Sequence, residues 1–342
     1  MTIGSALDTT VLDMALDDLH VGAPSWIALP LSDKVALLEA LPPKILDVAP
    51  QMVATAGHAK GIASTSAWVA EDWMLAVWAF IQVVNAHTVA LKRVLAGQEP
   101  IKANAVHTRP DGQVVVDVFP VTGYDRLLLN GYKAQVWIEP GVSGAQTRKD
   151  AAKMYRGVGY DHPGVCLVLG AGNLGSITTL DVLDQLYAHG RVCVVKMNPV
   201  NDYLGPFYEK IFSEFVSRGW LRFVYGGADA GGYLAHHRKT DSIHMTGSAT
   251  TYDAIVWGTD AEIVTRKGAN VGSCLAGGTP GAVKRQQTAH TPAEDVGVTG
   301  TCSASRHILG TAAQLLPYPT VPRNTADSNT AGYQHCVFVI ML

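Results

Sequence analysis

The feature that most constrains the fold is a regular alternation of short apolar runs and amphipathic stretches between residues 163 and 258. The runs VCLVLGAG, RVCVVKMNP, LRFVYGG and SIHMTGS have the length and apolar content of buried strands, and a stretch with helical periodicity follows each of them. This alternation predicts an α/β protein whose parallel sheet is covered by helices on both faces. Right-handed crossovers then place the C-terminal ends of the strands on one edge, where ligands bind in such sheets.

Glycine-rich turns follow three of these strands. The first turn, GAGNLG at residues 170–175, has the GxGxxG spacing of a Rossmann-type dinucleotide-binding turn. Gly226–Gly227 and Gly247–Ser248 follow the third and fourth strands and precede helices, where backbone N–H groups can bind an anion. For any single turn, the alternative that glycine only lets a strand turn into a helix stays open. Three such turns on one edge together favour a phosphate-bearing ligand.

The second strand ends in Lys196, where an ordinary Rossmann dehydrogenase has an Asp or Glu that holds the ribose. A lysine at this edge can hold adenine-ribose hydroxyls or a phosphate as a point charge, and a solvated lysine at a strand end is the alternative. The residues expected to bind the cofactor are Gly170, Gly172, Lys196, Gly226, Gly227, Gly247 and Ser248.

Several motifs in this region carry a family resemblance. The segments PGVCLVLGAGN, VVKMNPVNDYLGPF, FVYGGADAGGYLAHH and IHMTGSATTYDAIVWG resemble, in order, the cofactor-domain motifs of the aldehyde dehydrogenase superfamily. The resemblance implies an aldehyde dehydrogenase-like fold, an NAD or NADP cofactor, a small-molecule aldehyde substrate and a homo-oligomer. It also implies an oxyanion-stabilising role for Asn173, an adenine-ribose role for Lys196 and a pyrophosphate role for Ser248. Pro199 stands where many members have a glutamate, which leaves NADP open.

The chemistry of that family needs a nucleophilic cysteine, whose thiolate attacks the aldehyde to form a thiohemiacetal. Cys336 in NTAGYQHC and Cys302 in VTGTCSAS are the two candidates, and a chain without a competent nucleophile is the alternative. Cys166 and Cys193 lie within predicted strands and are expected to be inert core residues.

The glutamate motif that supplies the general base in that family is missing. The acids in the expected interval, none in a matching context, are Glu262, Glu294 and Asp295. Three functions therefore stay open: an NAD(P)-dependent aldehyde dehydrogenase, a nucleotide-binding relic that cannot turn over, and a CoA-acylating aldehyde dehydrogenase that needs no such base.

The sequence suggests four regions. They are a helical N-terminal region at 1–110, a strand pair and candidate oligomerisation segment at 111–145, the NAD(P)-binding domain at 146–258, and an altered or poorly ordered catalytic remnant at 259–342. The abrupt loss of pattern after 258 suggests a truncated chain or a change of reading frame.

Two local expectations concern the N-terminal region. Ser32 is expected to cap the helix that begins in SDKVALLEA. The apolar stretch that contains Trp68, Trp73 and Trp78 is expected to form a buried helix rather than a ligand cage.

Composition excludes several classes of function. A net charge of −3 argues against nucleic-acid binding, and the sequence contains no apolar run long enough to predict a membrane span. The acidic N-terminus does not resemble a secretory signal, so we expect a cytoplasmic protein. The five cysteines lack CxxC spacing, and His236, His237 and His244 lack the spacing of metal ligands, so no metal site is expected.

Overall fold

The computed structural model describes residues 8–160, 163–248, 251–252, 254–255, 297–300 and 338–341. The chain divides into two compact units, which are described separately. Unit 1 comprises Met1–Val84 and Tyr160–Ala304, and unit 2 comprises Asn85–Gly159 and Ser305–Leu342. Each unit joins segments that are far apart in the sequence, whereas the four regions suggested above follow one another along the chain.

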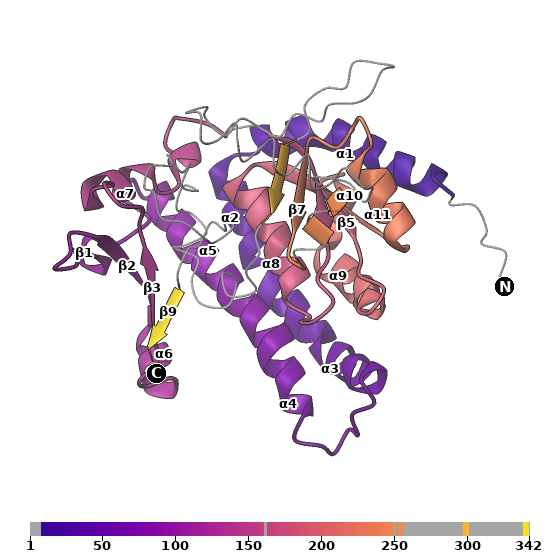
Figure 1. Ribbon diagram of the computed structural model, residues 1–342, viewed down its shortest axis with the longest axis horizontal. Coiled ribbons are helices and arrows are strands. Elements are labelled where there is room, and N and C mark those ends of the chain that lie inside the picture. The colour runs from indigo at the N-terminus through magenta and orange to yellow at the C-terminus, as the bar shows by residue number, and fades with distance from the viewer. Residues whose placement is uncertain are drawn as a thin grey trace, which may run out of the picture. The chain divides into compact units, whose positions relative to one another are not determined.

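Unit 1 is built around a parallel sheet with the strand order β6-β5-β4-β7-β8 (Figure 1). The strands are β4 (Gly164–Leu169), β5 (Arg191–Lys196), β6 (Leu221–Val224), β7 (Ser242–Met245) and β8 (Gly297–Gly300). The first four coincide with the four apolar runs, so the predicted parallel sheet is confirmed. The fifth, β8, lies in a region where the sequence pattern predicts no strand.

The strands of this sheet consist of continuous apolar runs because helices cover both of its faces. Val165, Val168, Val192 and Val194 are each 0% exposed, although neighbouring side chains on a strand point to opposite faces. The connecting segments are α8 (Ile177–Leu183), its π-helical continuation η4 (Asp184–Ala188), η5 (Asp202–Leu204), α9 (Gly205–Ile211), α10 (Ser213–Ser217) and α11 (Ala228–Ala235).

One of the predicted helices is divided in two. The stretch LGPFYEKIFSEFVSRG was expected to form a single helix, but α9 ends at Ile211 and α10 begins at Ser213. Phe212 between them has a ψ of 21°, which lies outside the helical range, and its side chain is fully buried. The burial of this ring accompanies the break in the backbone.

The helix α1 (Thr10–Ala28) packs against β4, β5 and β6. It lies beside α11, since the Tyr233 hydroxyl of α11 donates to Asp13 Oδ1 of α1 at 2.6 Å. Right-handed crossovers from β4 to β5 and from β5 to β6 place α8 and α9 on the opposite face of the sheet. The sheet is therefore the middle layer of three.

The other N-terminal helices are α2 (Leu31–Glu39), α3 (Leu41–Ala59), α4 (Val69–Asp72), the π-helical η1 (Trp73–Trp78) and α5 (Ala79–Leu95). The expected cap at Ser32 is wrong. The helix α2 already begins at Leu31 after Pro30, whose fixed φ suits the start of a helix, and the Ser32 hydroxyl donates to Asp33 Oδ1 instead.

The expectation of a buried tryptophan helix is wrong for two of the three rings. Trp68 is 71% exposed and Trp73 is 40% exposed, while Ala76, Val77 and Phe80 provide the buried face. By length and composition alone, the continuous helix Val69–Leu95 could cross a membrane, with half of its most apolar window buried. Core helices meet the same criterion, so this is weak evidence for a membrane span.

Unit 2 contains an antiparallel sheet with the strand order β1-β2-β3-β9 (Figure 1). Its elements are η2 (Ala103–Ala105), β1 (Val106–Thr108), β2 (Val114–Phe119), α6 (Gly123–Leu128), β3 (Lys133–Trp137), α7 (Gly144–Asp150), η3 (Lys153–Tyr155) and β9 (Phe338–Met341). The strand pair predicted within 111–145 corresponds to β2 and β3. The segment between them contains α6, because Thr122 and Asp125 form a capping box at its start.

Candidate functional site

The C-terminal ends of four neighbouring strands of unit 1 lie in register. Leu169, the last residue of β4, pairs with Lys196 of β5 on one side and with Met245 of β7 on the other. Lys196 in turn pairs with Val224, the last residue of β6. We call these four strand ends, with the turns that follow them, the carboxyl edge. All of the candidate cofactor-binding residues and Asn173 lie on this edge.

Close packing explains the glycines in the turn between β4 and α8. The Gly170 amide donates to the Lys196 carbonyl at 3.0 Å, and a Cβ at position 170 would lie 3.2 Å from the same oxygen. A Cβ at Gly172 would lie 2.9 Å from the side-chain nitrogen of Asn198. The first turn therefore lies directly against the chain that leaves β5. Asn173, the candidate oxyanion donor, is an exposed residue of this turn.

The polar residues after β5 are part of the site but were not predicted from the sequence. Asn201 is buried, and its amide donates to the carbonyl of Ala171 at 3.3 Å. The Asn198 side-chain oxygen accepts from the Val200 amide at 3.1 Å. Two asparagines three residues apart, directly after a buried strand that ends at the ligand edge, were the available signal.

Lys196 is held at the edge rather than extended into solvent. The residue is only 8% exposed, and burial lowers the pKa of its ammonium, partly offset by the Asp229 carboxylate. Asp229 is an exposed residue in the first turn of α11, which follows β6. These observations disfavour the solvated-lysine alternative and add Asp229, which the sequence patterns did not reveal, to the carboxyl edge.

The other two turns differ in how their glycines are used. Gly226 has a φ of +133°, a conformation that favours glycine, and Gly227 precedes the first residue of α11 without a side-chain cap. Ser248 is exposed, and its hydroxyl accepts from the Thr251 amide at 3.2 Å, as an N-cap side chain does. Gly247 immediately precedes this capping residue and is also exposed.

The residues of the edge fit the phosphates of a dinucleotide. The Ser176 hydroxyl at the start of α8 is buried and has no hydrogen-bond partner among the residues that the structure describes. A Cβ at Gly170 or Gly172 would crowd Lys196 or Asn198, so these glycines set how closely the first turn packs on the chain that leaves β5. Lys196 supplies a cation on the neighbouring strand.

The predicted catalytic cysteines, Cys336 and Cys302, lie outside the described residues, as do the acids at 262, 294 and 295. The prediction for the two strand cysteines is confirmed. Cys166 and Cys193 are both fully buried, and burial raises the pKa of the Cys166 thiol to about 11 and that of Cys193 well above its ordinary value. Neither thiol forms the reactive thiolate at neutral pH.

Two cavities in unit 1 lie away from the carboxyl edge. One of about 330 Å³ is lined by residues of α2, α3 and α10, including Leu37, Leu41 and Phe215. A more open one of about 530 Å³ lies between α1 and the segment after α11 and includes His20 and Lys239. Neither of these two cavities is lined by a residue of the candidate site.

The fold is mixed α/β, with a parallel sheet and flanking helices as the sequence predicts. No protein-family model and no curated protein matches this sequence.

The solved structures similar to this chain include several named as aldehyde dehydrogenases. Proline utilization A from Bdellovibrio bacteriovorus is 15% identical over 74% of this chain and 21% of its own, with a TM-score of 0.45. The AldH protein of Staphylococcus aureus is 12% identical over 71% of this chain and 42% of its own (TM-score 0.44). Lactaldehyde dehydrogenase from Escherichia coli is 14% identical over 71% and 40% (TM-score 0.43). This chain thus spans less than half of each of these proteins.

Proposed function

We propose that the carboxyl edge of unit 1 binds a nicotinamide dinucleotide and that the protein is an oxidoreductase of the aldehyde dehydrogenase type. The observation that carries this proposal is the register of four parallel strands, which brings three glycine-bearing turns and Lys196 to one edge. The order of the cofactor-domain motifs in the sequence supports it. The names of the similar solved structures agree with this proposal, but the proposal does not depend on them.

Each turn contributes a different part of the proposed cofactor site. The glycines at 170 and 172 let the first turn pack against Lys196 and Asn198, which would set the position of its main chain at the cofactor site. The amides at Gly227 and at the start of α11, where the N-cap glycine has no side chain to accept from them, would offer N–H donors to phosphate oxygens, and the Ser248 hydroxyl would add a polar group at the neighbouring turn. Lys196 contributes a positive charge and donors for the ribose hydroxyls or for a 2′-phosphate. Since Pro199 offers no carboxylate to the 2′-hydroxyl, both NAD and NADP are candidate cofactors.

The proposed reaction oxidises an aldehyde to a carboxylic acid. A bound nicotinamide would accept the hydride from the thiohemiacetal carbon, and water would hydrolyse the resulting cysteine thioester to release the acid and the free thiol. The exposed amide of Asn173 would donate to the oxygen that becomes negatively charged when a cysteine thiolate attacks the carbonyl carbon. Such a donor contributes about 3 kcal/mol when it is aimed at the developing charge. Cys336 is the first candidate for the nucleophile and Cys302 the second.

The first experiment measures binding. The purified chain is titrated with NADH and with NADPH, and affinity is followed by isothermal calorimetry. Lys196→Ala is expected to weaken binding about tenfold or more, because the loss of a charged hydrogen bond costs about 1.5–3 kcal/mol. Lys210→Ala, which removes an exposed lysine of α9, is the matched control and should bind as the wild type does. If Lys196→Ala and wild type bind equally well, the proposed role of the lysine is wrong.

The second experiment separates the three activities. Reduction of NAD or NADP is followed spectroscopically with an aldehyde, first without and then with CoA. Turnover without CoA supports the dehydrogenase, turnover only with CoA supports the acylating enzyme, and binding without turnover supports the relic. For an active protein, Cys336→Ser and Cys302→Ser identify the nucleophile, since only the variant without it loses turnover.

A further inference from the structure

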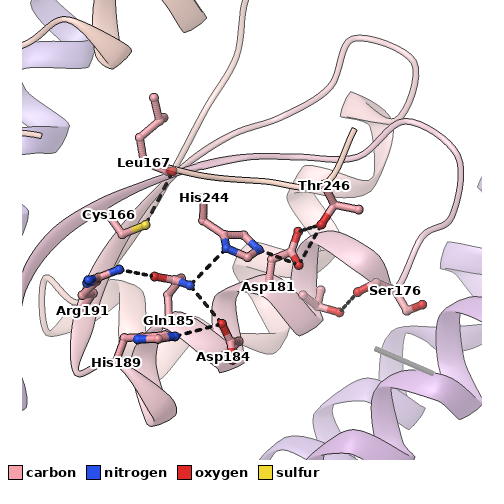
Figure 2. Close-up of polar contacts among 11 residues, drawn as sticks. Cys166, Leu167, Ser176, Asp181, Asp184, Gln185, His189, Arg191, His244 and Thr246 are labelled. Atoms are coloured by element: carbon pink, nitrogen blue, oxygen red, sulfur yellow. Dashed lines mark hydrogen bonds and ion pairs between the residues drawn. The ribbon is translucent and has the colours of Figure 1, made fainter. Parts of the chain in front are cut away.

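A buried polar network lies under the carboxyl edge, between β7 and the helical segments α8 and η4 (Figure 2). Asp181 and Gln185 are 0% exposed, His244 is 1% exposed and Thr246 is 8% exposed. Every one of these side chains is therefore removed from water, where an unsatisfied polar group is costly. We call Asp181, Asp184, Gln185, Arg191, His244 and Thr246 the Asp181 network.

Asp181 is the centre of this network. Its Oδ1 lies 3.1 Å from His244 Nε2, and the Thr246 hydroxyl lies 3.2 Å from Oδ1 and 3.1 Å from Oδ2 (Figure 2). The hydroxyl has one proton to donate, so it is shared between the two carboxylate oxygens. A carboxylate in this position connects His244 of β7 and Thr246 just after it, two residues apart in the sequence, to one residue of α8.

The far side of the histidine ring is held by Gln185. Arg191 donates to Gln185 Oε1 at 3.2 Å, and Gln185 Nε2 donates to Asp184 Oδ2 at 3.0 Å. These two bonds fix the orientation of the amide, so its NH₂ group is the one that faces His244 Nδ1 at 3.2 Å. In a neutral ring, Nδ1 then accepts a hydrogen bond from the Gln185 amide, and the ring proton lies on Nε2. In both protonation states of His244, Nε2 therefore carries a proton and lies 3.1 Å from Asp181 Oδ1, a close electrostatic contact rather than an aligned hydrogen bond.

The position of the network along the chain gives it a connection to the site. Asp181 lies in α8, the helix that follows the Gly170–Ser176 turn. Thr246 lies between the last residue of β7 and Gly247. The bond from Thr246 to Asp181 therefore joins two of the turns of the carboxyl edge through side chains, in addition to the backbone pairing of β4 with β7.

We propose that Asp181 is a positioning residue for the dinucleotide site: through the Thr246 hydroxyl it holds the Gly247–Ser248 turn at a fixed distance from the Gly170–Ser176 turn. His244, oriented by Gln185, provides the polar partner that allows a carboxylate to remain buried there. This inference rests on the proposed function, because a ligand whose phosphates bridge the two turns needs them at the right separation. Asp181 itself does not contact the ligand.

The test uses a substitution that removes the hydroxyl and keeps the shape. Thr246→Val loses the bond to Asp181, and Thr246→Ser restores it. The matched control is Thr240→Val, because Thr240 is also buried and its hydroxyl donates to the Leu234 carbonyl at 2.8 Å, but it lies after α11 and away from the edge. Thermal melting of all three variants shows whether the two valine substitutions destabilise the fold to a similar degree.

NADH binding is the first measurement. Thr246→Val is expected to weaken affinity about tenfold, Thr246→Ser to stay within about threefold of wild type, and Thr240→Val to bind as wild type does. Wild-type affinity in Thr246→Val would overturn the inference. An equal loss in Thr240→Val would overturn it too, because the effect would then follow general destabilisation.

Hydrogen exchange of the unliganded protein separates this inference from the proposed function. In Thr246→Val, peptides that cover residues 243–248 are expected to exchange faster than in wild type, and those of Thr240→Val are not. If wild type binds neither NADH nor NADPH, the proposed function fails, and the exchange data still decide whether Asp181 holds the turn. Unchanged exchange in Thr246→Val would overturn the positioning role regardless of ligand binding.

Discussion

Unit 1 buries charge in two different ways. Asp181 is surrounded by polar partners, with the His244 ring on one side and the Thr246 hydroxyl on the other. Lys34 of α2 is 2% exposed and packs on aromatic rings, with its ammonium 4.7 Å from the centre of the Trp26 ring and 5.0 Å from that of Tyr160. The same ammonium donates to the Tyr160 hydroxyl at 3.2 Å.

The net pKa shifts at the two sites have opposite directions. Burial lowers the pKa of His244, but the carboxylates of Asp181 and Asp184 outweigh it, so the net shift is upward. Burial lowers the pKa of Lys34 to about 8, because aromatic faces and one hydroxyl compensate a lost hydration shell less than a carboxylate does. The Asp181 network therefore offsets the burial of its charge with polar partners, whereas burial of the Lys34 charge costs stability.

The largest expected effect comes from removing the carboxylate at the centre of the network. Asp181→Ala leaves the Thr246 hydroxyl and the His244 ring buried without their partner, and it should reduce the free energy of unfolding by about 3–5 kcal/mol. Urea denaturation followed by circular dichroism measures this loss. Asp47→Ala, at an exposed position of α3, is the control and should change stability by less than about 0.5 kcal/mol. A loss below about 1 kcal/mol in Asp181→Ala would mean that the network does not depend on its charge.

A second substitution tests how firmly the Tyr160 ring is held over Lys34. Gly190 has a φ of +67°, and a Cβ there would lie 2.5 Å from Tyr160 Cγ. Gly61 has a φ of +69° with nothing within 4 Å of the same position, so Gly61→Ala reports the backbone cost alone, about 1–2 kcal/mol. Gly190→Ala should add the cost of displacing the ring and lose about 3 kcal/mol in all. Equal losses in the two variants would show that the ring moves aside freely.

The parallel sheet and its carboxyl edge could be predicted from the sequence because both depend on local patterns. The runs around Val165 and Val192 are apolar without alternation, and the glycines follow each strand directly. Crossover handedness then brings the turns together without any knowledge of side-chain contacts.

The Asp181 network and the exposed tryptophans could not be predicted in this way. Asp181 occupies a helix and His244 a strand, and only the packing of that helix on the sheet brings them to 3.1 Å. Hydrophobic periodicity likewise identifies an apolar helix but not how much of its surface the rest of the fold covers. For this reason Trp68 and Trp73 are exposed although their segment has the composition of a core helix.

The third prediction is a pH dependence that belongs to Lys34. Its pKa is about 8 in the folded protein against an ordinary value of 10.5, so between these pH values the unfolded chain binds more protons than the folded one. Stability therefore rises with pH across this window, by about 2–3 kcal/mol at most. Urea denaturation of wild type and of Lys34→Met at pH 8 and at pH 10.5 isolates the contribution, since other groups titrate in both proteins. A difference between the two proteins that does not change with pH would show that the lysine keeps its proton as readily in the fold as in water.

The smallest expected effect is the one that separates the two sites most clearly. At pH 7 Lys34 is charged in both states, so Lys34→Met removes a buried charge while keeping an unbranched side chain of similar length. It loses the Tyr160 hydrogen bond and the contact with the rings, and the net result should be a gain in unfolding free energy of about 1 kcal/mol. Lys210→Met, at an exposed position of α9, should leave stability within about 0.5 kcal/mol of wild type. Asp181→Ala is expected to lower the free energy of unfolding and Lys34→Met to raise it. The sign of the change therefore distinguishes a buried charge that stabilises the fold from one that destabilises it. If Lys34→Met destabilises the protein instead, the fold uses the charge of Lys34 as it uses that of Asp181. The aromatic rings would then be as effective a partner for a buried cation as a carboxylate is.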